Sequence, residues 1–187
     1  MKYQAEFRDP DLAKLQLQAI RSAAAELNRT ITLMEVCGTH TMAIYQHGIR
    51  ALLPPEIRLI SGPGCPVCVT PVGFVDHAVA LARRPATIIA TFGDMVRVPG
   101  SSSSLMLEQA RGANIKIVYS PLDAVALAEQ HLDSEVVFLG VGFETTAPTV
   151  AGSIIAAVQR NLRNFSVLCS HNTMPGPMAA FASDPEL

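Results

Sequence analysis

The stretch VVFLGVGFETTAPTVAGSIIAAVQRN, residues 136–161, joins a strand pattern to a helix pattern through a short polar turn. Its first six residues are apolar or glycine and include β-branched valines, which is typical of a buried strand. From residue 147 onward the apolar residues have the spacing of a helix. A strand followed so closely by a helix is part of a right-handed βαβ unit, so this stretch predicts a parallel sheet.

The same alternation of strand and helix continues along most of the chain. Further strand patterns lie at residues 31–36, 57–60, 87–91, 115–119 and 166–168, and helical patterns lie at about 41–52, 72–83, 102–111, 122–131 and from 175 onward. We therefore predict an α/β fold: a doubly wound, mostly parallel sheet with helices on both faces. Asp9 and Pro10 open an amphipathic leading helix within residues 1–30, and residues 31–187 are predicted to form the α/β domain.

Composition and charge narrow the functional classes. The 187 residues are 49% hydrophobic, enough for one substantial core. With 14 basic and 16 acidic residues, a net charge of −2 and no basic run, the sequence lacks the positive surface typical of nucleic-acid binding. The polar start and the absence of a membrane-length apolar stretch predict a cytoplasmic protein without a membrane partner. In that reducing compartment, the four cysteines are expected to be ligands, nucleophiles or redox groups.

Motifs rich in cysteine, glycine and polar residues follow every predicted strand. They are CGTH (37–40), GPGCPVC (62–68), TFGD (91–94), SPLD (120–123), GVGFETT (140–146) and CSHNT (169–173). The carboxyl ends of parallel strands meet at one edge of a sheet, which is where open α/β sheets bind ligands. We therefore expect these motifs to converge on one site.

Cys65 and Cys68 form a C-x-x-C pair. A disulfide between them would close a loop of only four residues, worth roughly 2 kcal/mol, so a purely structural bond is disfavoured. The pair can instead cycle between dithiol and disulfide. Together with Cys37 and His40 it also makes a Cys₃His set with the spacing common in zinc sites. Both alternatives remain open at this point.

The other two cysteines have different surroundings. Cys37 stands alone between a strand pattern and a helix pattern, and is a candidate soft-metal ligand or nucleophile, with His40 as a base or second ligand. Cys169 ends an apolar strand pattern and is expected to be a small core residue.

The loop after the fifth predicted strand resembles the dinucleotide-binding fingerprint, but Thr145 stands where the third glycine would be, so NAD binding is weakly supported. Glu144, Thr145 and Thr146 at the helix start either bind a polar ligand or cap a turn. Asp94 and His171 add charge and hydrogen-bonding capacity to the same edge, although each alone is more often a capping residue.

Five motifs in order resemble the HypD family of hydrogenase maturation factors. They are CGTHT (37–41), GPGCPVCVTP (62–71), TFGDMVRVPGS (91–101), GFETTAP (142–148) and SHNTMP (170–175), and the resemblance covers the chain from about residue 31 to its end. It implies a scaffold on which the Fe(CN)₂CO centre of nickel–iron hydrogenases is assembled. It further implies a small HypC-like partner that shares the iron fragment, and HypE as the cyanide donor.

The resemblance also implies roles for individual residues. Cys37 would be the iron ligand, and Cys65 and Cys68 the redox-active pair. The remaining residues expected in the site are His40, Asp94 and Glu144 in the chemistry and Thr39, Thr145, Thr146 and His171 in binding. Family members continue into a second lobe and a cysteine-rich domain with a [4Fe-4S] cluster, whose ligands are absent from this chain. The alternative function is a structural-zinc (Cys₃His) α/β binding module.

Overall fold

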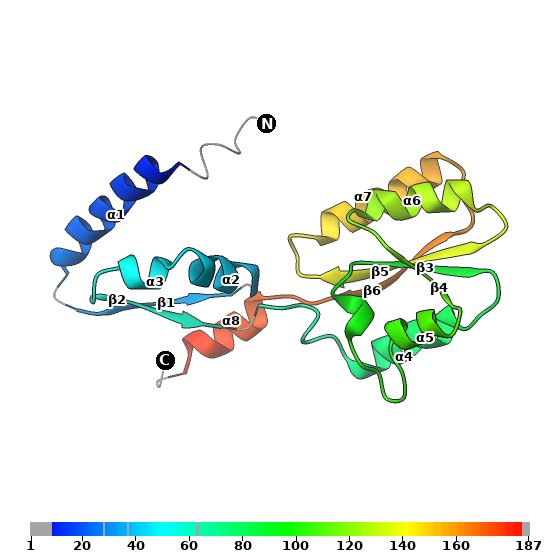
Figure 1. The fold of residues 1–187 in the computed structure, drawn as a ribbon, viewed down its shortest axis with the longest axis horizontal. Coiled ribbons are helices and arrows are strands. Elements are labelled where there is room, and N and C mark those ends of the chain that lie inside the picture. The colour runs from blue at the N-terminus through cyan, green and yellow to red at the C-terminus, as the bar shows by residue number, and fades with distance from the viewer. Residues whose placement is uncertain (1–8, 28, 37, 63, 185–187) are drawn as a thin grey trace. The chain divides into compact units, whose positions relative to one another are not determined.

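The computed structural model describes residues 9–27, 29–36, 38–62 and 64–184, and it confirms an α/β fold with parallel strands (Figure 1). The elements, in chain order, are α1 (Pro10–Ala25), β1 (Ile31–Glu35), α2 (Gly38–Gln46), α3 (Ile49–Leu52), β2 (Ile57–Ser61), α4 (Val72–Ala82), β3 (Thr87–Thr91), the 3₁₀ helix η2 (Met95–Arg97), α5 (Leu105–Ala110), β4 (Asn114–Ile117), α6 (Pro121–Gln130), β5 (Glu135–Gly142), α7 (Ala147–Gln159), β6 (Phe165–His171) and α8 (Pro175–Ala182).

The chain divides into two compact units, Met1–Cys65 and Pro66–Leu187. In the first unit β1 pairs with β2, with Ile31 opposite Ile57. In the second unit four parallel strands lie in the order β4-β3-β5-β6. The strands predicted for residues 31–187 are thus divided between two sheets. The predicted domain organisation, a leading helix over 1–30 and an α/β domain over 31–187, stays a prediction.

The core of the second unit is built on its two central strands. All five residues of β3 are buried, as are seven of the eight residues of β5. Strands buried on both faces require helices on both faces. Helices α4 and α5 cover one face and α6 and α7 cover the other (Figure 1). This confirms the predicted arrangement of helices about the sheet.

Side chains cap the starts of two helices, and the Asp9 cap of α1 is the one that the sequence predicts. The Asp9 carboxylate accepts hydrogen bonds from the amides of Asp11 and Leu12, at 2.8 and 3.2 Å, and Pro10 follows it. In α6, Ser120 and Asp123 cap each other's backbone reciprocally. These bonds satisfy amides that have no partner within the helix.

Two helical predictions need correction. The helix expected over 41–52 is two helices, because Gly48 adopts a left-handed conformation with φ of 61° that ends α2. Helix α2 also begins earlier than expected, at Gly38, so the CGTH motif lies partly in its first turn. Helix α5 begins at Leu105, later than the start expected at residue 102, because Ser104 caps it by accepting a hydrogen bond from the Leu107 amide.

Three motifs lie partly inside strands: TFGD begins at Thr91, the last residue of β3, and the motifs at 140–146 and 169–173 begin within β5 and β6. Pairing of β5 with β6 continues to Gly142 opposite His171. Gly140 and Cys169 are paired within the same ladder. Strand β5 continues through these glycines because the backbone of β6 pairs with it as far as Gly142.

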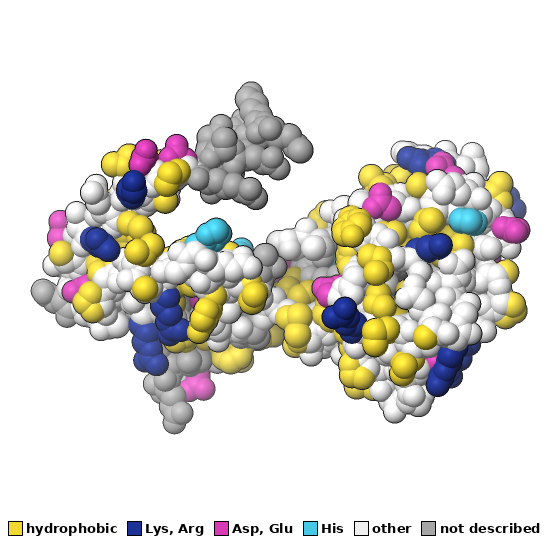
Figure 2. Space-filling view, viewed as in Figure 1, with side chains coloured by type: hydrophobic (Ala, Val, Ile, Leu, Met, Phe, Trp, Pro, Cys, Tyr) yellow, Lys and Arg dark blue, Asp and Glu magenta, His cyan; other side chains and the backbone are white. Residues whose placement is uncertain are grey.

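Side chains at the surface are mixed in character. Figure 2 shows hydrophobic side chains interspersed with polar and charged ones on the visible face. Among the described residues, no helix combines the length and the apolar character that crossing a bilayer requires.

Candidate functional site

Residues 66–69, which include Cys68 of the CPVC motif, form a turn at the start of the second unit. The Thr70 amide donates to the Val67 carbonyl at 3.3 Å, and the Thr70 hydroxyl donates to the Pro66 carbonyl at 2.9 Å. Cys68 lies exposed on this turn, whereas Cys65, the last residue of the first unit, is half-buried. The turn is therefore shaped by its own hydrogen bonds and presents Cys68 to solvent.

A small hydrophobic cluster joins this turn to two other motifs. Val67 packs against a buried cluster made of Val75 from α4, Met95 from the TFGDM motif and Val141 from β5. Met95 and Val141 are 1% and 6% exposed, so the contact is made in the interior. Three motifs that are far apart in sequence are thus held together at the carboxyl ends of β3 and β5. Within the second unit, this supports the expected convergence of motifs.

The loop after β3 is fixed from two directions. Asp94, an exposed residue, caps η2 by accepting a hydrogen bond from the Met95 amide at 3.0 Å. Further along, the Asp76 carboxylate of α4 accepts bonds from the amide and the hydroxyl of Ser101, at 2.7 and 2.6 Å. These hydrogen bonds from Ser101 lower the pKa of Asp76 below its ordinary value. Asp94 therefore has a capping role here, and Asp76 is a positioning residue that the sequence analysis missed.

The loops after β5 and β6 are tied to each other. Glu144 accepts a hydrogen bond from the Met174 amide at 2.7 Å, and the Asn172 amide donates to the Gly142 carbonyl at 2.9 Å. Thr145 is exposed, and the Thr146 hydroxyl donates to the Phe143 carbonyl at 3.0 Å. Although Thr146 occupies the N-cap position of α7, its side chain makes no capping bond. Glu144 and Thr146 thus brace the loop locally.

His171 lies against β5 beside Cys169. The Cys169 Sγ and the His171 Nδ1 are 3.2 Å apart, and the His171 Nε2 is buried without a hydrogen-bond partner among the described residues. An added Cβ at Gly142 would lie 3.2 Å from Nε2 and would also collide with Thr146, so glycine makes room for the imidazole here.

The prediction that Cys169 is a core residue was wrong. Its side chain is exposed, because it lies on the outermost strand of the sheet. The C-x-H spacing within a strand, which puts both side chains on one face, was the signal in the sequence that would have identified this pair.

In the first unit, the ends of β1 and β2 hold the CGTH and GPGC motifs close to each other. The Gly62 amide donates to the Glu35 carbonyl at 2.8 Å, and the Gly38 amide donates to the Gly64 carbonyl at 3.4 Å. His40 is exposed in the first turn of α2. Cys37 and the side chain of Thr39 lie outside the described residues. The two motifs therefore meet through their backbones.

Glu35 is a residue of this region that the sequence analysis missed. Its Oε1 accepts a hydrogen bond from the Ser61 hydroxyl at 2.8 Å, and its Oε2 is buried with no hydrogen-bond partner among the described residues. A carboxylate at the end of a mostly apolar strand, two positions before Cys37, was the available signal.

In the described part of the chain, no group of three or more histidine, cysteine or acidic side chains is arranged to hold a metal ion. Because Cys37 is outside this part, the Cys₃His set stays a hypothesis. The convergence of Cys37 and His40 with the motifs of the second unit likewise stays a prediction.

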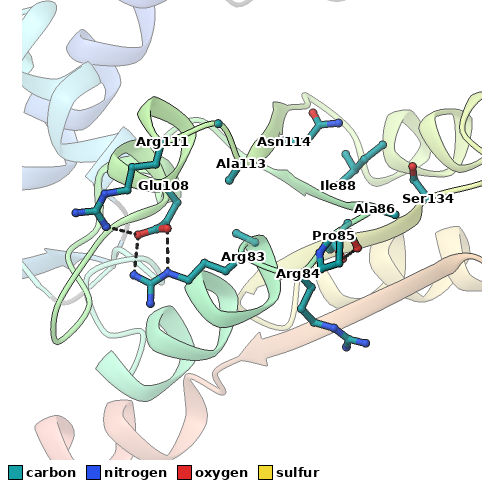
Figure 3. Close-up of a pocket in the computed structure, with 13 residues that line it drawn as sticks. Arg83, Arg84, Pro85, Ala86, Ile88, Glu108, Arg111, Ala113, Asn114 and Ser134 are labelled. Carbon is teal, nitrogen blue, oxygen red and sulfur yellow. Dashed lines mark hydrogen bonds and ion pairs between the residues drawn. The ribbon is translucent and has the colours of Figure 1, made fainter.

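A pocket of about 440 Å³ lies at the opposite edge of the four-stranded sheet, where β3 and β4 begin (Figure 3). Glu108, only 3% exposed, accepts two hydrogen bonds from Arg83, at 2.8 and 2.9 Å, and one from Arg111 at 3.0 Å. The Ser103 hydroxyl also donates to it. The bonds from Arg83 and then Ser103 lower the pKa of Glu108 to about 2. None of the predicted site residues lines this pocket, so it is separate from the candidate site.

Comparison with known proteins places the chain in a family. A family model described as HypD, hydrogenase formation hypA family, matches residues 11–187. The chain belongs to the HypD family. It is 49% identical to the hydrogenase maturation factor HypD of Rhodobacter capsulatus over 99% of this chain and 50% of that protein. The HypD proteins of Azotobacter vinelandii and Escherichia coli K12 are 50% and 42% identical over the whole chain. The chain spans about half the length of these HypD relatives.

Proposed function

We propose that this HypD chain is part of a scaffold on which the Fe(CN)₂CO fragment of nickel–iron hydrogenases is assembled. A HypC-like protein would share the iron fragment, and a HypE-like protein would supply cyanide. Family membership supports the hydrogenase maturation context. The observation that carries the proposal is the packing of Val67 against the buried cluster of Val75, Met95 and Val141, which fixes an exposed cysteine turn beside residues of two other motifs.

The thiols have separate roles in this proposal. Cys37 would bind the iron fragment, since thiolate is a soft ligand suited to such a metal. Cys65 and Cys68 would form a reversible disulfide, losing two electrons and two protons on oxidation. His40 would serve as a nearby base or second ligand. Iron is the cargo of this scaffold, which the proposal treats as a substrate.

The polar residues at the ends of β5 and β6 would bind or orient the incoming groups. Glu144 holds the backbone of the β6 loop, so its expected contribution is to position His171. Asp94 holds η2 in the same way. Thr39, Thr145 and Thr146 are proposed as hydrogen-bonding residues for polar ligands of the iron.

Replacing Cys37 by alanine tests the iron assignment. We expect Cys37→Ala to lose at least about tenfold of the iron retained after anaerobic co-purification with a HypC-like partner, because a soft donor is removed. Infrared bands of bound carbonyl and cyanide should disappear with it. The control is His77→Ala, an exposed position on α4. Wild-type iron content in Cys37→Ala would contradict the assignment.

The same preparation separates the scaffold from the zinc alternative. One zinc per chain, lost in Cys37→Ala and Cys65→Ala alike, would favour a structural Cys₃His site. Loss of iron in Cys37→Ala alone, with iron retained in Cys65→Ala, would favour the scaffold.

A redox titration tests the role of the C-x-x-C pair. Alkylation followed by mass spectrometry should show two fewer reactive thiols in the oxidised chain than in the reduced chain, both in the peptide that holds Cys65 and Cys68. Equal labelling of this peptide at every potential would count against a redox function.

A further inference from the structure

Cys169 and His171 form a thiol–imidazole pair that the proposed function does not use for thiol chemistry. The pair lies at the end of β6, with Sγ and Nδ1 3.2 Å apart and the thiol exposed. Thiol and imidazole within this distance form the arrangement by which histidine activates a cysteine nucleophile. We propose that Cys169 is a nucleophilic thiol that attacks disulfides, with His171 as the acceptor of its proton.

The surroundings of His171 fix which ring nitrogen serves this role. Nε2 is buried beside Gly142, and a Cβ added to Gly142 would lie 3.2 Å from it. The ring carbon Cε1 faces Gly140, and a Cβ added to Gly140 would lie 3.5 Å from that carbon. The register of β5 and β6 places both glycines directly opposite the pair, with Gly140 beside Cys169 and Gly142 beside His171. Nδ1 is therefore the nitrogen that can exchange a proton with Sγ.

The backbone holds the two side chains in register. Residues two apart in a strand point to the same face, so Cys169 and His171 are neighbours without any loop movement. The hydrogen bond from the Asn172 amide to the Gly142 carbonyl extends the ladder one residue past His171. The pair is thus built on a rigid element, which is what precise positioning of reacting groups requires.

The reaction balances without a further oxidant. The Cys169 thiol gives its proton to His171 Nδ1, and the thiolate attacks one sulfur of a disulfide. A new disulfide bond forms between Cys169 and that sulfur as the original sulfur–sulfur bond breaks. The departing thiolate then takes the proton from the imidazolium. One disulfide and one thiol enter the reaction, and one disulfide and one thiol leave it.

Two sources can supply such a disulfide. One is a small-molecule disulfide in solution, and the other is the oxidised pair of Cys65 and Cys68 in the same chain. The shared chemistry is an accessible disulfide sulfur, and the experiment separates the sources. No iron and no partner protein takes part, so this inference stands or fails apart from the proposed scaffold function.

The test follows each cysteine by its own peptide. The reduced chain is treated with glutathione disulfide, samples are quenched at intervals, and mass spectrometry measures the mixed disulfide at Cys169. We expect Cys169 to react about tenfold faster in the folded chain than in the chain unfolded in guanidinium chloride. We further expect His171→Asn to slow the folded chain about tenfold.

Controls distinguish proton transfer from packing. His77→Asn makes the same substitution at an exposed histidine of α4 and should react like wild type. Loss of packing around His171 would expose Sγ further and speed the reaction, opposite to the expected slowing. If the Cys169 rate is the same in wild type and His171→Asn, or no faster folded than unfolded, the proposal is wrong.

Two further arms identify the source. A chain with Cys65→Ser and Cys68→Ser should still form the glutathione adduct if small disulfides are substrates. Wild-type chain oxidised without glutathione should give a peptide that links Cys169 to Cys65 or Cys68 if the internal pair is the substrate. Absence of both products would overturn the proposal.

Discussion

Glu108 is a buried carboxyl group with a strongly lowered pKa. Its carboxylate is nearly inaccessible and bound by two arginines and a serine hydroxyl, and its pKa is lowered to about 2 from an ordinary value of 4.5. The unfolded chain therefore binds a proton at this carboxyl at a higher pH than the folded chain does. Stability from Glu108 is fully present above about pH 5 and is lost as the pH falls toward 2.

We predict that Glu108→Gln removes the part of the pH dependence of stability that comes from this carboxyl group. At neutral pH the variant should melt lower by about 5 °C or more, since a neutral amide leaves the guanidinium of Arg83 without its counter-charge. Between pH 5 and pH 3 the wild-type melting temperature should fall more steeply than that of the variant. Thermal unfolding followed by circular dichroism across this range measures both.

A matched control is Glu129→Gln. Glu129 also pairs with an arginine, Arg160, at 3.0 Å, but both side chains are more than 40% exposed. Exposed ion pairs contribute little to stability, so this variant should melt within about 2 °C of wild type. If both substitutions lower the melting temperature equally, burial of Glu108 does not account for its contribution to stability.

Single residues were also where sequence reasoning was weakest. The spacing of Cys65 and Cys68 was readable directly, but exposure of Cys169 depends on β6 being the outermost strand, which is a property of strand order. Likewise, Asp76 and Ser101 are 25 positions apart, and only the fold brings them into contact.

At the scale of elements, the loop after β3 shows how a motif is held. Gly100 donates its amide to the Ser103 carbonyl at 2.8 Å, and the adjacent Ser101 is bound by Asp76. A Cβ at Gly100 would lie 2.5 Å from the Asp76 carboxylate and 3.0 Å from the Ser103 carbonyl. Glycine at this position is therefore required by the close approach of two acceptors.

We predict that Gly100→Ala loosens this loop. Because the backbone must shift to admit the methyl group, the Asp76–Ser101 bonds should weaken and amide hydrogen exchange in residues 98–104 should become at least about tenfold faster. Hydrogen exchange read by mass spectrometry measures this directly. Unchanged exchange in residues 98–104 would contradict the inference that the loop requires glycine at position 100.

Gly73→Ala provides the opposite control. Gly73 lies in α4 with no atom within 4 Å of an added Cβ. Alanine is favoured over glycine within a helix by roughly 0.5–1 kcal/mol, so this variant should melt slightly higher than wild type. It should leave exchange of the loop unchanged.

Elements were the level at which the sequence was most informative. Apolar, β-branched runs located the strands, because buried strands such as β3 need apolar residues on both faces. The length of β6 was underestimated, because its last residues are polar. Only their pairing with β5, which the sequence does not show, keeps them in the strand. The η2 turn was missed because three residues are too few for a periodic pattern.

At the scale of the whole molecule, burial is distributed unevenly between the two units. The three hydrophobic clusters consist of residues between Val67 and Leu168, all in the second unit. In the described part of the first unit, Ala24 is the one fully buried hydrophobic residue. Most of the apolar burial that stabilises the fold is therefore in the second unit.

We predict that the two units unfold separately, with the first unit unfolding at lower denaturant concentration. Amides of β1 and β2 should exchange at least about a hundredfold faster than those of β3 and β5, because opening the first unit exposes little buried apolar surface. Native-state hydrogen exchange of the whole chain at increasing urea measures this. A single shared transition, with equal protection of β1 and β5, would contradict it.

The parallel sheet of the second unit gives that unit two edges with different uses. The pocket that contains Arg83, Glu108 and Arg111 lies where the strands begin, and the Cys169–His171 pair lies where they end. A five-residue strand separates such edges by about 16 Å. A chain anchored to a resin or an electrode through an azide-bearing residue introduced at Asn114, a coupling in which the exposed Cys68 and Cys169 thiols do not compete, would thus present Cys169 and His171 outward. Partner proteins and reductants could then be assayed on an oriented surface.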